Sequence, residues 1–204
     1  NLSEYIKNPF TPDAAFNVDE FRQDIWYIIK AMDDLVDENL PNHALNMQRE
    51  VAQKFRNLGV GVMGIQDMLI KLGLTYGKPE SIQALEYIMK TIIQSAIEAS
   101  HSLALQRGSF PEYSERMFDS EFCKNTGLDH VAIDRFKKGG LRNSTLLSIA
   151  PTGSIGTMLN ISSGVEPWFS MHYTRNTKSL EGKDTSYEVW APIAEEANKR
   201  NWHP

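Results

Sequence analysis

Residues 145–157 read Thr145-Leu146-Leu147-Ser148-Ile149-Ala150-Pro151-Thr152-Gly153-Ser154-Ile155-Gly156-Thr157 and change from an apolar run into a polar loop with two glycines. The apolar part, residues 145–150, is a β-like run that predicts a short strand. Proline and glycine then predict a turn, and Thr157-Met158-Leu159 allows a helix to follow. Elsewhere helices alternate with short apolar strands, so the sequence favours an α/β or mixed architecture.

The loop between the expected strand and helix has the layout of an anion site. Unpaired backbone N–H groups point outward at a helix start, and the helix dipole there favours negative charge. Glycine lets a phosphate oxygen approach the backbone without meeting a Cβ atom. The candidate residues are Pro151, Thr152, Gly153, Ser154, Ile155 and Gly156. The Gly-Lys-Ser/Thr ending of an ATPase loop is absent, and an ordinary capped turn between strand and helix explains the same spacing.

Two helices are predicted from their apolar spacing and their end signals. The first follows Asn17 as N-cap and stops before Pro41. Its expected buried stripe is Phe21, Ile25, Ile28, Met32 and Leu35. The second begins at Pro79 and ends at Gly108. Its expected stripe is Ile82, Leu85, Met89, Ile92, Ala96, Ala99 and Leu103.

The remaining segments predict shorter elements. Residues 1–15 are expected to be extended, and residues 58–64 form an apolar, glycine-broken run that predicts a buried strand approached closely by another backbone. Short helices are expected at 43–56, 65–72 and 131–138. The C-terminal part predicts a strand over 168–175 and a helix over 187–200.

Metal-ligating residue types occur at two places. Glu98 and His101 have the Glu-x-x-His spacing of carboxylate-bridged di-iron bundles, but a second such pair is missing, so a solvated helix face is the better interpretation. The acidic run Asp33, Asp34, Asp37 and Glu38 could hold a divalent cation, although such runs are more often wet helix ends. The sequence therefore supports no assigned metal ligand.

Three further side chains, one thiol and two guanidinium groups, are candidates for a functional role. Cys123 has no Cys-x-x-Cys partner and no nearby histidine, so neither a metal-ligand nor a nucleophile role is supported. Arg142 and Arg175 flank the candidate loop in sequence and could reach a phosphate, but a surface ion pair is equally compatible with either position.

Composition excludes several classes of protein. With 41% hydrophobic residues the chain can bury a core, so intrinsic disorder is excluded. A net charge of −5 without a basic block argues against nucleic-acid binding. No apolar run approaches a membrane span, and the single cysteine fits a reducing compartment, so a soluble cytoplasmic protein is expected. Because the chain starts at Asn1 without Met, we expect it to be cut from a longer polypeptide.

Several short motifs follow one another along the chain: 1–5 (NLSEY), 57–64 (NLGVGVMG), 106–110 (QRGSF), 141–144 (LRNS), 149–155 (IAPTGSI) and 163–167 (SGVEP). In this order they resemble the large catalytic subunit of ribonucleotide reductase. Together these motifs span essentially the whole chain. Their sequences are most similar to those of the cobalamin-dependent enzymes and of their iron- or manganese-dependent relatives.

The resemblance implies that residues 1–204 are the C-terminal part of the catalytic domain, a helix-rich fragment of a ten-stranded α/β barrel. It also implies that residues 151–156 bind the phosphate of a ribonucleoside di- or triphosphate. The family's thiyl-radical cysteine and reducing cysteine pair are not matched by any residue here, Cys123 included, so no catalytic residue is assigned and the fragment alone is expected to be inactive.

Cofactor and partners follow only from the resemblance. No cofactor is expected in the fragment, whereas the parent would use adenosylcobalamin or a di-metal radical subunit. Its partners would be the rest of the catalytic subunit, a thioredoxin-type reductant and that radical-generating subunit. Two alternatives remain, a non-catalytic helical interaction module with an anion-binding loop and a di-iron carboxylate protein. Neither accounts for the ordered motifs.

Overall fold

The computed structural model describes residues 1–177 and 185–202, with the side chains of Arg175, Thr177 and Thr185 outside the description. The chain divides into two compact units. The first unit comprises Asn1–Asn17, Val62–Gln83 and Ala150–Pro204, and the second comprises Val18–Gly61 and Ala84–Ile149. Each unit is described by itself below.

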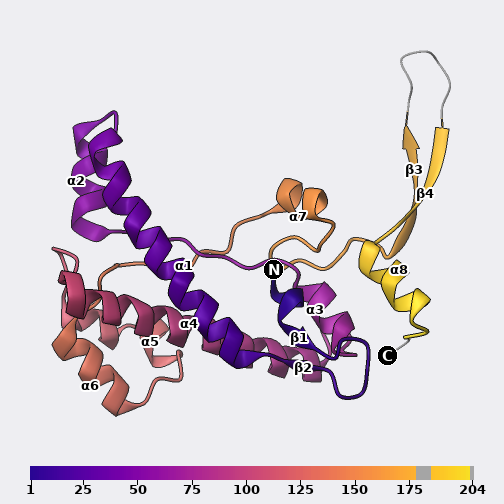
Figure 1. Cartoon of the computed structure of the whole chain (residues 1–204), viewed down its shortest axis with the longest axis horizontal. Helices are drawn as coiled ribbons and strands as arrows, with labels where there is room; N and C mark the ends of the chain where they lie inside the picture. The colour runs from indigo at the N-terminus through magenta and orange to yellow at the C-terminus, as the bar shows by residue number, and fades with distance from the viewer. Residues whose placement is uncertain (178–184, 203–204) are drawn as a thin grey trace. The chain divides into compact units, whose positions relative to one another are not determined.

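The second unit is built mainly from helices (Figure 1). Its elements are α1 (Val18–Asn39), η2 (Leu40–Asn42), α2 (Asn46–Phe55), the part of α4 (Pro79–Arg107) from Ala84 onward, η3 (Glu115–Asp119), α5 (Glu121–Lys124) and α6 (His130–Gly139). The end signals predicted α1 and α4 correctly. Thus α1 ends before Pro41, and α4 runs from Pro79 to Arg107, followed by Gly108 in the left-handed conformation at φ +84°.

The predicted stripe of α1 is confirmed at Phe21 and Ile25 and wrong at Ile28 and Leu35, whereas Met32 is half-buried. Phe21, Ile25, Ile29 and Asp33 are buried, at a constant spacing of four, whereas Ile28 and Leu35 are exposed. A row of residues four apart drifts slowly around the helix, and α1 packs along that row instead of the expected row of mixed spacing. The buried stripe consequently includes a charged residue, which an apolar pattern cannot reveal.

The stripe predicted for α4 is confirmed over its C-terminal half. Ile92, Ala96, Ala99 and Leu103 are buried, but Ile82 near the start of the helix is exposed. The apolar core beside α4 combines Ile97, Phe110, Phe118, Cys123, Phe136 and Leu141. The predicted helix at 131–138 corresponds to α6, whose N-cap Asp129 accepts a hydrogen bond from the Ala132 N–H.

Two backbone segments of the second unit run parallel, side by side. Val60 and Leu147 form a parallel bridge, the Leu58 N–H donates to the Thr145 carbonyl at 2.9 Å, and the Ser148 N–H donates to the Val60 carbonyl at 3.0 Å. The expected close approach of another backbone is confirmed, because a Cβ added at Gly61 would lie 2.7 Å from the Ser148 carbonyl oxygen. Residues 58–64 are not one continuous strand, however, since Gly64 has φ +74° and caps the next helix. The described residues contain no closed barrel.

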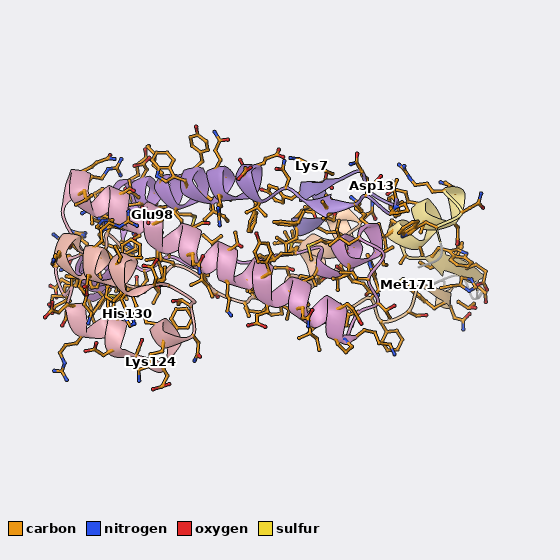
Figure 2. The ribbon with its side chains drawn as sticks, turned by 90° about the horizontal axis from the view of Figure 1, so that it is seen from below. Lys7, Asp13, Glu98, Lys124, His130 and Met171 are labelled. Atoms are coloured by element: carbon orange, nitrogen blue, oxygen red, sulfur yellow. The ribbon has the colours of Figure 1, made fainter. Side chains whose placement is uncertain are left out.

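The first unit combines short helices with two antiparallel ribbons. Its elements are η1 (Leu2–Tyr5), β1 (Ile6–Lys7), β2 (Ala15–Phe16), α3 (Ile65–Lys71), α7 (Gly153–Leu159), β3 (His172–Thr177), β4 (Thr185–Trp190) and α8 (Pro192–Lys199). The entry segment is therefore not simply extended: η1 leads into the ribbon of β1 and β2, where Figure 2 labels Lys7 and Asp13. Both η1 and α8 contact α3.

The C-terminal predictions need correction. Residues 187–190 lie in β4, which pairs with β3 from His172 opposite Trp190 to Thr177 opposite Thr185. The helix begins only at α8, with Pro192 in its first turn, where proline suits the helix geometry. Cross-strand pairing overrides the weak helical pattern of Tyr187 and Val189. The position of Arg175 is on β3, but its side chain lies outside the described part of the structure.

Candidate phosphate-binding loop

Residues 151–156 turn into helix α7 as the sequence predicted. Thr152 is the N-cap, and its carbonyl accepts the first helical bond from the Gly156 N–H at 2.7 Å. Gly153, Ser154 and Ile155 are exposed, and a Cβ added at Gly153 would meet nothing within 4 Å. The N–H groups of a first helical turn have no acceptor inside the helix. The loop therefore combines the N–H donors of a helix start with an exposed backbone, as an anion site requires, and its phosphate role stays a prediction.

A second turn, residues 162–165, packs against this loop. The Gly164 N–H donates to Thr152 Oγ1 at 2.8 Å. Gly164 has φ +50°, and a Cβ there would lie 3.1 Å from the Ala150 carbonyl oxygen. A Cβ at Gly156 would meet Ser163 Oγ. The two segments thus touch through backbone at both ends of the loop, which is possible only because these two positions are glycine.

Helix α3 holds this second turn in place. Ser162 makes three hydrogen bonds with this part of the chain. Its N–H donates to Asp67 Oδ2 at 2.8 Å. Its hydroxyl accepts from the Gln66 N–H at 3.2 Å, and its carbonyl accepts from the Gly64 N–H at 2.8 Å. Tyr76 adds a hydroxyl bond to the Val165 carbonyl at 2.7 Å. Asp67 and Ser162 are 2% and 1% exposed. Sequence reasoning missed Asp67, whose one signal is a carboxylate directly before the apolar residues 68–70 of a short helix.

Glu98 and His101 have different environments in the structure. Glu98, labelled in Figure 2, is 45% exposed at its side chain and pairs with Arg135, so its predicted solvated position is confirmed. For His101 that prediction is wrong. It is 3% exposed, its Nδ1 lies 2.9 Å from the Gly140 carbonyl oxygen, and its ring meets Phe136 edge-on. No group of three or more potential metal ligands occurs among the described residues.

The acidic run of α1 is not solvated at every position, because Asp33 lies in the interior. Asp33 is fully buried, and its carboxylate accepts from Arg56 at 2.7 and 3.0 Å, from Arg107 at 3.0 Å and from Asn143 at 3.0 Å. Arg142 approaches the same carboxylate at 3.3 Å. Cationic and amide donors therefore occupy Asp33 where a metal ion would bind.

Arg142 belongs to the Asp33 cluster, which comprises Asp33 and the four residues that bind it, Arg56, Arg107, Arg142 and Asn143. Besides Asp33, its guanidinium contacts Asp37 at 3.5 Å and donates to the carbonyls of Arg107 and Gly108, both at 3.2 Å. Of the two interpretations of Arg142, the structure has the ion pair, but the predicted surface position is wrong, because the pair with Asp33 is mostly buried. Cys123 is a free, buried thiol in the apolar core of the second unit.

The Asp33 cluster makes stability depend on pH. Burial by itself would raise the pKa of Asp33, but hydrogen bonds from Arg56 and Asn143 and the charges of Arg56 and Arg142 outweigh it, so the pKa lies below its ordinary value. A carboxyl group with a lower pKa in the folded state stabilises the protein above its unfolded pKa, and this contribution is lost as the pH falls through the folded pKa.

We therefore expect acid to destabilise the second unit, beginning near the ordinary aspartate pKa of about 4 and continuing below it. Hydrogen exchange of residues 84–107 between pH 6 and 3, in 0.5 M salt to screen exposed pairs such as Lys30–Asp34, measures the effect. In Asp33→Asn this part of the pH dependence should disappear. An unchanged acid profile in that variant would contradict the assignment.

No helix of the described residues is both long and apolar enough to cross a membrane.

The chain is similar to known proteins over most of its length. A family model described as "Ribonucleotide reductase, barrel domain" matches residues 1–200. A vitamin B12-dependent ribonucleoside-diphosphate reductase of Thermoplasma acidophilum is 31% identical over 90% of this chain. One of Mycobacterium tuberculosis is 29% identical over 80% of the chain, and the ribonucleoside-diphosphate reductase large subunit of monkeypox virus is 28% identical over 89%. The chain spans 21%, 21% and 24% of the lengths of these relatives.

Proposed function

The chain belongs to the ribonucleotide reductase barrel-domain family, and we propose that the protein carrying it reduces ribonucleotides to deoxyribonucleotides. The observation that carries the proposal is the family match, which extends over residues 1–200. Relatives from an archaeon, a bacterium and a virus are named as ribonucleoside-diphosphate reductases. In this proposal residues 1–204 form the C-terminal part of a ten-stranded α/β barrel, and the parallel pair at Val60 and Leu147 belongs to its inner strands.

The reaction would proceed by thiyl-radical chemistry on cysteines outside these residues. Cys123 is the single cysteine of the chain, and it lies buried in an apolar core. Because this chain holds no second cysteine, Cys123 can form no redox pair within it, and its position in the apolar core suits a packing role. The contribution of this chain is accordingly binding and orientation of substrate.

For the parent protein we propose adenosylcobalamin as the radical source, because two of the relatives are named as vitamin B12-dependent. A di-metal radical subunit is the alternative, and a thioredoxin-type reductant would regenerate the cysteines. No residue of this chain is assigned to either cofactor. The substrate would be a ribonucleoside diphosphate, in line with the names of the relatives, with the triphosphate as the alternative.

Within the chain, residues 151–156 would hold the substrate phosphate. Three features support this: exposed N–H donors at Gly153, Ser154 and Ile155, the hydroxyl groups of Thr152 and Ser154, and the open space at Gly153. Hydrogen bonds to a charged acceptor are stronger than those between neutral groups. A phosphate would thereby gain donors from backbone and side chains without the need for a lysine.

We expect Gly153→Val to weaken binding of CDP by about tenfold or more, because a branched side chain covers the N–H donors that bind the charged group. The open surroundings of Gly153 leave room for the new side chain, so the fold should persist. Equilibrium binding of CDP to the full-length protein measures the effect, and binding of cytidine, which lacks phosphate, should not change.

Met158→Val is the matched control, since it places the same branched side chain on an exposed position of α7 away from the loop. It should bind CDP normally. If Gly153→Val binds CDP as tightly as the unaltered protein, the loop is not the phosphate site.

A further inference from the structure

We propose that Asp67 is a positioning residue for the phosphate loop, acting through Ser162 and the turn at residues 162–165. The inference rests on the proposed function of residues 151–156. It assigns a role to a buried carboxylate that contacts neither the loop nor a ligand directly. The steps of the chain of contacts all lie within the first unit.

The first step joins Asp67 to Ser162. Both residues are almost completely buried, and the Ser162 N–H donates to Asp67 Oδ2 at 2.8 Å. Asp67 stands in the first turn of α3, where the helix dipole favours a negative charge. A hydrogen bond to an ionised carboxylate is short and strong, so α3 fixes the start of the turn at one backbone atom.

The second step joins the turn to Thr152. Two residues after Ser162, the Gly164 N–H donates to Thr152 Oγ1 at 2.8 Å. A hydroxyl group has one proton and two lone pairs. Because this bond uses a lone pair, it orients the hydroxyl and leaves its proton to donate to a phosphate oxygen. Thr152 does not cap its own helix with this side chain, so Gly164 is what holds it.

The turn has little freedom to move independently of Asp67. Gly164 has φ +50° and comes so close to the Ala150 carbonyl that a Cβ would lie 3.1 Å from it. Tyr76 binds the next carbonyl, that of Val165, at 2.7 Å. A displacement of Ser162 would therefore be passed to Thr152 through this backbone. A binding group misplaced by about 1 Å can lose a large part of its effect.

The test compares Asp67→Ala, Asp67→Glu and Asp67→Asn in the full-length protein. Asp67→Ala should weaken CDP binding by about tenfold and leave cytidine binding unchanged, because only the phosphate contacts are misplaced. Asp67→Glu keeps the charge but moves the acceptor by one methylene, so it should show the same selective loss even if Asp67→Ala fails to fold. Asp67→Asn retains an acceptor of the right length and should restore CDP binding to within about twofold.

Trp202→Phe is the control for a general loss of stability. Its indole N–H donates to the Ile70 carbonyl at 2.9 Å, near the other end of α3 and away from the turn. This variant should lower thermal stability while CDP affinity per folded molecule stays unchanged. The same behaviour in Asp67→Ala and Asp67→Glu would mean a merely structural role and would overturn the inference.

The Gly153→Val variant separates this inference from the proposed function. If Gly153→Val weakens CDP binding and the Asp67 variants do not, the positioning role is wrong and the phosphate loop stands. If neither Gly153→Val nor the Asp67 variants affect CDP binding, both are wrong.

Discussion

Replacing Asp33 with alanine is expected to lower the free energy of unfolding of the second unit by about 3–5 kcal/mol, the cost of removing one partner from a buried ion pair. The carboxylate is 0% exposed and accepts from Arg56, Arg107 and Asn143. Its removal leaves the buried guanidinium of Arg56 with the exposed carboxylate of Asp37 but without its buried counter-charge. Urea denaturation followed by hydrogen exchange of residues 84–107 measures the loss.

Asp34→Ala is the matched control, because Asp34 is the next residue on the same helix and also pairs with Arg107. Its side chain is 39% exposed, and solvent screens its ion pairs with Lys30 and Arg107. The urea midpoint should therefore hardly change. Equal losses in Asp33→Ala and Asp34→Ala would show that burial of Asp33 is not what makes the cluster important.

The second large effect is expected at Gly61. An alanine Cβ there would lie 2.7 Å from the Ser148 carbonyl oxygen, and this atom belongs to a backbone that cannot rotate out of the way. The parallel segments around Val60 and Leu147 would have to separate, so we expect a loss of about 1–3 kcal/mol, typical of overpacking in a close-packed interior. Faster hydrogen exchange at the N–H groups of Val60 and Ser148 would locate the damage.

Gly59→Ala provides the graded comparison on the same segment. Its Cβ would lie 3.3 Å from the Ser148 Cβ, which is a side-chain contact that small shifts can relieve. It should destabilise the unit less than Gly61→Ala. The reverse order would mean that the approach of the two backbones does not limit this position.

Local signals in the sequence were sufficient for the long helices and for the loop. Pro79 and Gly108 bound α4, Pro41 follows the end of α1, and the Pro-Thr-Gly-Ser segment leads into α7. These signals act through backbone geometry within a few residues, so they operate whatever the rest of the chain does. The family, too, was identified from motifs in order along the chain, and the match over residues 1–200 bears it out.

Long-range pairing was not accessible in this way. The hairpin of β3 and β4 replaces part of a predicted helix, because Val189 faces Tyr173 across the ribbon, and no short-range pattern encodes that partner. The sequence predicts a solvated position for His101, whereas its ring is buried and hydrogen-bonds with the Gly140 carbonyl. A polar residue can be buried only when a partner from elsewhere binds it, and the sequence does not name the partner.

By itself, the sequence determined where the two long helices begin and end and to which family the chain belongs, since each of these depends on neighbouring residues or on ordered motifs. It also predicted the loop of residues 151–156 as an anion site. The tertiary structure alone decided that Asp33 is enclosed by arginines from three distant segments and that Asp67 supports the turn beside Thr152. The physical reason is the same for both carboxylates. A buried charge is stable only where folding brings its donors together, and those donors lie far away in the sequence.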